Sequence, residues 1–252
     1  MNNFKKLKRY IFWKLNIDKF ILRITKNYWN KGKNYEWIYE FIEGKNLESR
    51  SIVEIGSRDA LDSISMLKKF NFKKAFIFEP SIPGIKESLK NIEKSKFKNK
   101  INFYPFAIGC STELRTFYEN TEKIDVPNIG ASSFSSSNLL EYKSYKVPIF
   151  KITDVLGDEN SDFYLLMIDV EGFELEVISN QKNFFSKFKF ICIEVAFSTD
   201  NYPKHTNLLH VDKILDVYGF KLYSSKHFGQ ITIDELLNNN QKYVDLLYKK
   251  SN

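Results

Sequence analysis

Residues 51–63, with the sequence SIVEIGSRDALDS, constrain the fold of this chain more than any other segment. A short strand rich in β-branched residues runs into Gly56, and Asp59 stands where a helix is expected to begin. A second apolar strand, AFIFEP, follows and ends in Glu79. This order is typical of the nucleotide-binding half of an open parallel sheet, where the glycine lets the backbone approach a ligand and the acid accepts hydrogen bonds from ribose. Because no G-x-G-x-x-G is present, the pattern favours a nucleoside with an amino-acid-like arm over a dinucleotide.

Strands and helices are expected to alternate along the rest of the chain, which predicts an α/β fold. The apolar runs at 162–170 and 188–197 are almost continuous, which is typical of parallel strands covered on both faces. The loop at 120–138 is rich in serine and long enough to act as a lid, although a surface excursion explains it equally well. The remaining expected strands are 52–55, 75–78, 101–104, 220–223 and 243–248, with extended segments at 112–118 and 147–152. The expected helices are 35–42, 59–70, 83–94, 174–185 and 207–218.

The net charge of +7 belongs to one end of the chain. Residues 1–33 hold ten Lys and Arg and one acid, a sum of +9, which leaves 7 − 9 = −2 for the remainder. A body so close to neutral argues against a nucleic-acid partner. Phe4, Leu7, Ile11 and Leu15 have helical spacing and predict a basic amphipathic helix. Such a helix either packs on the body or binds an anionic membrane surface or a partner. We therefore divide the chain into an N-terminal helical extension, 1–48, and an α/β domain, 49–252.

The sequence predicts a cytoplasmic protein, with peripheral contact at the inner face of the membrane as an option for the basic end. Cys110 and Cys192 are far apart and have no partners at metal-binding spacing, which favours reduced thiols. No apolar run approaches the roughly 18 residues that span a bilayer. Charged residues also interrupt any signal-peptide core near the start.

Acidic residues stand at the carboxyl ends of several expected strands, where an open parallel sheet binds its ligands. Asp169 follows a strongly apolar run and shares a strand face with Glu171. Gly172 permits a sharp turn, after which Glu174 falls in the first turn of the next helix and is suited to cap it. A carboxylate placed like Asp169 needs partners or a task, so we favour a functional role for Asp169 and leave Glu171 open.

Other polar residues near these strand ends are candidates for the same site. Glu54 lies between Val53 and Ile55 and is suited to bind a ligand ammonium group, while Arg58 pairs with an acid or with a ligand carboxylate. Glu194 lies inside another apolar strand and precedes His205 and His210. His205 is the better placed of the two to reach the site, although a single histidine is more often structural.

Together these motifs resemble the FkbM-type methyltransferases. The residues that carry the resemblance are the first strand with its acid and glycine, FEP, the AIG at 107–109, GASSF, VPIFKITDVL and above all IDVEGFELEVI at 168–178. The resemblance implies a class I, Rossmann-like fold with a mostly parallel seven-stranded sheet, helices on both faces, and S-adenosylmethionine as cofactor. By the same resemblance Glu54, Gly56, Ser57 and Arg58 hold the methionine arm, Glu79 accepts the ribose, and Phe106, Ala107 and Ile108 lie against adenine. Asp59, Pro80 and Asp169 are further cofactor-binding candidates.

The resemblance also implies an acceptor hydroxyl, on a sugar in surface-glycan (capsule or lipopolysaccharide) biosynthesis or on a natural product, with nucleotide- or lipid-linked sugars as candidate substrates. We predict that Asp169 takes the proton of that hydroxyl, with Glu171, Glu194 and His205 as alternates or acceptor-binding groups. A Mg²⁺ site formed by Asp169, Glu171 and Glu194 is the less favoured alternative.

Two positions depart from the family pattern. The family's Asp-x-Gly-Ala-Asn is here Glu54-Ile-Gly56-Ser57-Arg58, and Met167 replaces a frequent lysine. The first change keeps the acid and the glycine, whereas the second removes any role assigned to that lysine. Two rival interpretations remain: a non-catalytic Rossmann-like module in a glycan-assembly or membrane-surface complex, and an RNA methyltransferase. The near-neutral body and the absence of an N-P-P-Y/F motif count against the RNA methyltransferase.

Overall fold

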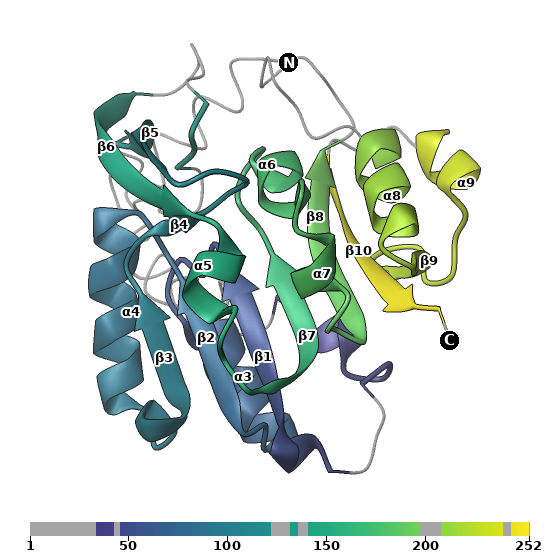
Figure 1. Cartoon of the computed structure of the whole chain (residues 1–252), viewed down its shortest axis with the longest axis horizontal. Coiled ribbons are helices and arrows are strands. Elements are labelled where there is room, and N and C mark those ends of the chain that lie inside the picture. The colour runs from purple at the N-terminus through teal and green to yellow at the C-terminus, as the bar shows by residue number, and fades with distance from the viewer. Residues whose placement is uncertain are drawn as a thin grey trace, which may run out of the picture.

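A seven-stranded sheet forms the centre of the molecule (Figure 1). The computed structural model describes residues 34–42, 46–121, 132–135, 141–196, 208–238 and 243–251. The strand order is β3-β2-β1-β7-β8-β10-β9, and β10 runs antiparallel to both of its neighbours while the other pairs are parallel. The strands are β1 (Arg50–Ile55), β2 (Lys74–Phe78), β3 (Ile101–Tyr104), β7 (Asp162–Ile168), β8 (Phe190–Ala196), β9 (Phe220–Ser225) and β10 (Tyr243–Lys250). The mostly parallel sheet expected from the sequence is confirmed.

The central strands are apolar because both faces of the sheet are covered. In β1, Val53 and Ile55 belong to one core cluster and Ile52 to the cluster on the opposite face. The helices α3 (Leu61–Phe70) and α4 (Ile82–Lys94) lie on the Ile52 side, and the opposite face is covered by α5 (Ile152–Leu156), α6 (Glu174–Ile178), α7 (Lys182–Phe185) and α8 (Leu208–Val217). A short helix, α9 (Ile233–Leu237), buries Leu236 in the core cluster that contains Val53 and Ile55. Helices on both faces were predicted and are found.

A second, three-stranded sheet was not predicted. It consists of β4 (Ala107–Ile108), β6 (Tyr142–Phe150) and β5 (Glu113–Asn120) in that order. The sequence identified parts of β5 and β6 as extended but gave no reason to pair them. The hydroxyl of Tyr145 in β6 accepts a hydrogen bond from the backbone N–H of Ile82 at 3.0 Å, so this sheet is joined to the start of α4.

Three expected helices differ from those in the structure. The helix expected at 59–70 begins at Leu61, because Ala60 has a left-handed conformation with φ +62°. The one expected at 174–185 is two short helices, α6 and α7, separated where Asn180 has φ +59°. The one expected at 35–42 is only a 3₁₀ turn, η1 (Glu36–Ile38). Two further 3₁₀ turns are η2 (Leu47–Ser49) and η3 (Lys98–Lys100).

The part of the N-terminal extension that the structure describes packs on the α/β domain. Tyr35, Ile38, Ile42 and Leu47 belong to the core cluster that also contains Ile52. The basic amphipathic helix expected from Phe4 to Leu15 lies outside the described residues. Within the described ranges, no helix combines the length and the apolar character that crossing a membrane requires.

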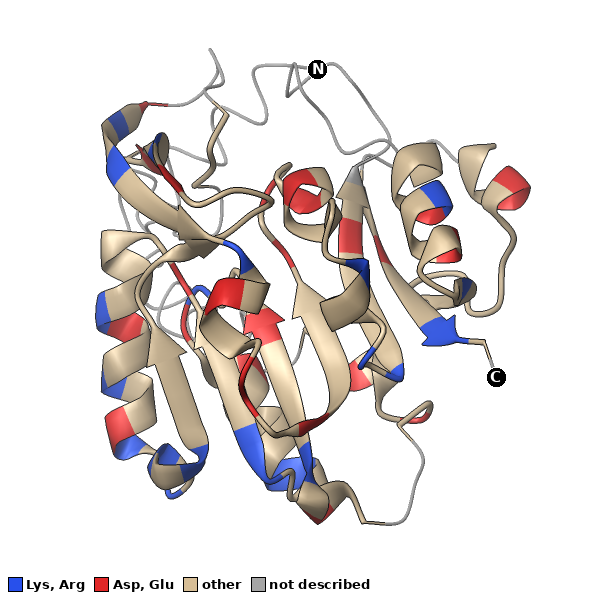
Figure 2. Cartoon of the chain, viewed as in Figure 1, with Lys and Arg blue, Asp and Glu red and all other residues tan. Residues whose placement is uncertain are grey.

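The topology fixes where a ligand can bind. From β1 the chain moves outward to β2 and β3, then returns to place β7 on the other side of β1. Loops leave β1 and β7 in opposite directions at their carboxyl ends, which opens the space that ligands of such sheets occupy. Figure 2 shows acidic positions toward this edge in β1, β8 and β10, which contain Glu54, Glu194 and Asp245.

Candidate functional site

The turn after β1 requires a glycine at position 56. Gly56 has φ +84°, and its N–H donates a hydrogen bond to the Phe78 carbonyl at 2.9 Å. A Cβ built on Gly56 would lie 1.8 Å from the backbone carbonyl oxygen of Asp169, far inside van der Waals contact. The β1 turn and the end of β7 are therefore in direct backbone contact, an approach that only glycine allows.

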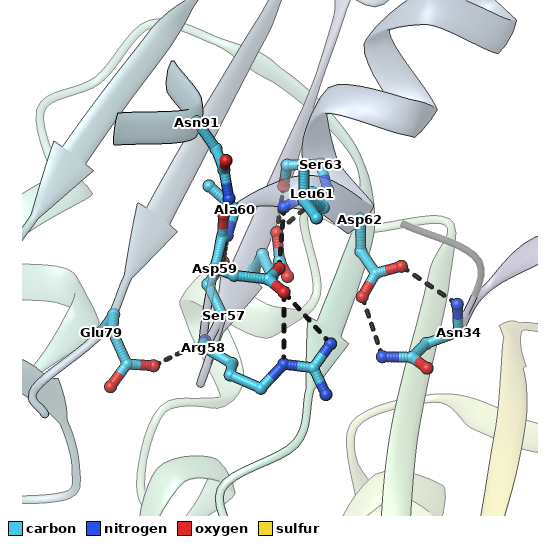
Figure 3. A network of polar contacts seen from close by, with 11 residues as sticks. Asn34, Ser57, Arg58, Asp59, Ala60, Leu61, Asp62, Ser63, Glu79 and Asn91 are labelled. Atoms are coloured by element: carbon cyan, nitrogen blue, oxygen red, sulfur yellow. Dashed lines mark hydrogen bonds and ion pairs between the residues drawn. The ribbon is translucent and has the colours of Figure 1, made fainter. Parts of the chain in front are cut away.

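Glu79, at the end of β2, holds this turn from the other side. One carboxylate oxygen accepts the Arg58 backbone N–H at 2.7 Å (Figure 3). The other accepts the backbone N–H of Ser81 at 2.7 Å. The first of these bonds stabilises the left-handed conformation of Arg58, whose φ is +57°. Glu79 is buried, which raises its pKa, while the bonds from Ser81 and Arg58 act in the opposite direction. Each oxygen keeps a lone pair that a ligand hydroxyl can use.

The carboxylates of Glu54 and Asp59 accept hydrogen bonds from the first residues of α3. The carboxylate of Glu54 accepts hydrogen bonds from the Ser63 backbone N–H at 3.2 Å and from the Ser63 hydroxyl. Glu54 still lines the pocket, and burial, followed by the charge of Asp62, raises its pKa. Asp59 accepts the Leu61 N–H at 3.1 Å and pairs with the Arg58 guanidinium at 3.3 Å. Asp59 does not line the pocket, and its role toward the cofactor stays a prediction.

The segment after β7 turns sharply before α6. Glu171 and Gly172 both have positive φ, +52° and +93°. Glu174 is buried and accepts the N–H groups of Gly172 and Val170 at 3.0 and 3.3 Å, so its carboxylate satisfies the backbone of the turn. It lies in the first turn of α6 as expected, but it does not cap that helix, because the N–H groups it accepts precede the helix. The hydroxyl of Ser133 donates to the Glu171 carbonyl at 2.7 Å and ties part of the 120–138 loop to the site.

Asp169, Glu171 and Glu194 form one carboxylate cluster, in which an oxygen of each lies within 4.8 Å of the others. All three are half-buried. Burial, followed by the charge of Asp245, raises the pKa of Asp169 to about 7. The charge of Asp169, followed by burial, raises the pKa of Glu194 to about 11, and burial raises that of Glu171.

Carboxylates at such spacing do not all ionise unless a cation joins them, so the cluster retains protons or attracts positive charge. Its oxygens are of the type that Mg²⁺ prefers, and the magnesium alternative stays a prediction. His205 lies outside the described residues, and His210 is exposed on α8.

A pocket opens at this edge and brings most of the predicted residues together. Those that line it are Glu54, Gly56, Ser57, Arg58, Glu79, Pro80, Phe106, Ala107, Ile108, Asp169 and Glu171. Glu194 contacts the pocket only through the carboxylate cluster. Sequence reasoning missed the lining residues Asn34, Tyr35, Asp62, Phe117, Ser132, Phe134 and Phe173. Of these, Asp62 lies within the 51–63 segment, Ser132 and Phe134 within GASSF, and Phe173 within IDVEGFELEVI. The Phe173 ring is 4.5 Å from that of Phe134.

Comparisons with known proteins identify the family and the fold of the chain. The sequence profile described as "Methyltransferase FkbM domain" matches residues 54–222. The fold is similar to that of methyltransferase FkbM from Methylobacillus flagellatus KT, with a TM-score of 0.54 and 14% identity over 87% of this chain and 47% of that one. This chain therefore spans about half the length of that relative.

A weaker likeness joins the chain to TrmK of M. capricolum, solved with S-adenosyl-homocysteine, at a TM-score of 0.45 and 11% identity over 80% of this chain and 62% of that one. No curated protein matches the sequence.

Proposed function

The chain belongs to the FkbM methyltransferase family, and we propose that it transfers the methyl group of S-adenosylmethionine to a hydroxyl of a sugar. The observation that carries the proposal is the direct contact between the glycine turn after β1 and the end of β7, which forms a pocket bounded by Glu79 on one side and by a carboxylate cluster on the other. This pocket lies at the position where the topology of the sheet provides for a nucleotide-like ligand.

The residues present fit that cofactor. Glu79 has free lone pairs for two ribose hydroxyls, and Phe106, Ala107 and Ile108 supply an apolar wall for adenine. The Gly56 turn leaves room for the amino-acid arm, which Ser57 and Arg58 flank. When bound, the sulfonium supplies an electrophilic methyl group and a positive charge that suits an acidic pocket.

The carboxylates give the chain a means to activate an acceptor. A hydroxyl is a weak nucleophile, and a carboxylate within hydrogen-bond reach takes its proton as the bond to carbon forms. Asp169 suits this role because its pKa of about 7 lies near the working pH. Glu171 and Glu194 then orient acceptor hydroxyls, and His205 is an alternate. Holding the acceptor in line supplies much of the acceleration.

The proposed setting is the cytoplasm, in surface-glycan or natural-product biosynthesis, with nucleotide- or lipid-linked sugars as acceptors. The basic N-terminus is proposed to bring the enzyme to an anionic membrane. Liposome flotation of the full chain tests this attachment, and absence of the chain from the lipid fraction would rule it out.

Two measurements separate the enzyme from the alternative, a non-catalytic binding module. The first is calorimetric titration with S-adenosylhomocysteine, which should bind. The second is incubation with methyl-labelled cofactor and a panel of nucleotide- and lipid-linked sugars, in which an acceptor should gain label. The module should not bind S-adenosylhomocysteine, so absence of binding favours the module and overturns both the cofactor and the reaction.

A further inference from the structure

Tyr35 lies in the pocket although it precedes residue 54, where the family match begins. The ring belongs to the core cluster beneath β1, and only 8% of the residue is exposed. Residues before and after Tyr35 in the sequence hold it in place. Ile38, one turn later, is fully buried, and its N–H donates to the Tyr35 carbonyl at 3.2 Å.

Asn34 fixes the other side of Tyr35. Its backbone N–H and its side-chain amide donate to the two carboxylate oxygens of Asp62, each at 3.0 Å, so this residue is clamped to the first turn of α3 (Figure 3). The clamp is buried on the α3 side, where Asp62 is 4% exposed. The segment before β1 is therefore a built part of the pocket wall.

The Tyr35 hydroxyl has no hydrogen-bond partner among the residues that the structure describes. The hydroxyl oxygen is not fully enclosed by protein atoms. Its small accessible surface therefore faces the pocket that Tyr35 lines. Burying a phenol hydroxyl without a hydrogen-bond partner costs free energy, unless a ligand or a water molecule supplies that partner.

The charges around this hydroxyl indicate which ligand group it meets. Burial, and then the nearby carboxylates of Asp169, Glu54 and Asp62 with the Cys192 thiol, raise the pKa of Tyr35, so the phenol keeps its proton. A surrounding of carboxylates repels an anionic group and attracts an ammonium group.

We propose that Tyr35 is a binding residue for the α-ammonium group at the amino-acid end of the cofactor, with its hydroxyl oxygen accepting an N–H hydrogen bond. The inference rests on the proposed function and adds to it a residue outside the matched domain. The neighbouring carboxylates attract the ammonium group by their charge, and the hydrogen bond to the Tyr35 hydroxyl orients it.

The test is calorimetry with three probes on the full chain: S-adenosylhomocysteine, its deaminated analogue, and 5′-methylthioadenosine, which lacks the amino-acid end. Tyr35→Phe keeps the buried ring and removes only the hydroxyl. It should weaken S-adenosylhomocysteine about tenfold, as for one hydrogen bond to a charged group. Binding of the other two probes should stay unchanged. Tyr39→Phe, in the same segment but outside the pocket lining, is the matched control and should change none of the three.

Equal affinity of the wild type and Tyr35→Phe for S-adenosylhomocysteine overturns the inference and leaves the proposed function in place. So does an equal loss for all three probes, which would mark a structural role. If the wild type binds none of the probes, the proposed function fails together with the inference.

Discussion

Replacing Gly56 with alanine tests the contact between the β1 turn and β7. The added methyl group lowers the free energy of unfolding in two separate ways. A left-handed backbone costs an L-residue about 1–2 kcal/mol. The 1.8 Å approach to the Asp169 carbonyl adds a clash with backbone rather than with a flexible side chain, and forced overpacking costs about 1–3 kcal/mol. We therefore expect the free energy of unfolding to fall by roughly 2–5 kcal/mol, together with loss of S-adenosylhomocysteine binding, because the displaced turn is a wall of the pocket.

Gly219→Ala is the matched control. Gly219 has φ +88°, and a Cβ added there would have no atom within 4 Å, so only the backbone cost of about 1–2 kcal/mol applies. Urea denaturation of both variants, followed by calorimetry, separates the clash from the backbone strain. Equal destabilisation of the two variants, with cofactor binding intact in Gly56→Ala, would show that the close approach of Gly56 to Asp169 neither stabilises the fold nor shapes the pocket.

Three further predictions concern the carboxylate cluster. Affinity for S-adenosylmethionine should rise about tenfold between pH 6 and 8, because Asp169, with its pKa raised to about 7, must lose its proton to attract a cation; calorimetry showing a flat or falling affinity contradicts this. Asp169→Asn should lower kcat by about 10²–10⁴-fold at saturating cofactor, and unchanged turnover with cofactor bound would remove Asp169 from the mechanism. Chelation with EDTA should leave methyl transfer unchanged, whereas a loss that added Mg²⁺ restores would make the cluster a metal site.

The sequence predicts the parts of this site that parallel strands impose. Gly56, Glu79 and Asp169 each follow an apolar strand, and the carboxyl ends of parallel strands share one edge of a sheet. Their convergence on one pocket therefore follows from local patterns, as do the strands themselves, whose apolar runs match burial on both faces.

Other features depend on contacts between distant segments. The Asn34–Asp62 clamp joins residues 28 positions apart, and nothing in the sequence around Tyr35 indicates a pocket residue. The pairing of β5 with β6 spans the long intervening loop. The left-handed conformations at Arg58, Ala60 and Asn180 also escaped prediction, because none of these residues is a glycine. At Arg58, the hydrogen bond that its N–H donates to Glu79 stabilises a backbone conformation that the local sequence does not favour.

A crystal structure of the full chain with S-adenosylhomocysteine would show directly whether the pocket at the β1 turn holds the cofactor. We predict ribose hydroxyls on the Glu79 carboxylate, adenine against Phe106, and the amino-acid arm over the Gly56 turn. A ligand found away from this edge of the sheet, or one that leaves Glu79 without contact, would contradict this prediction.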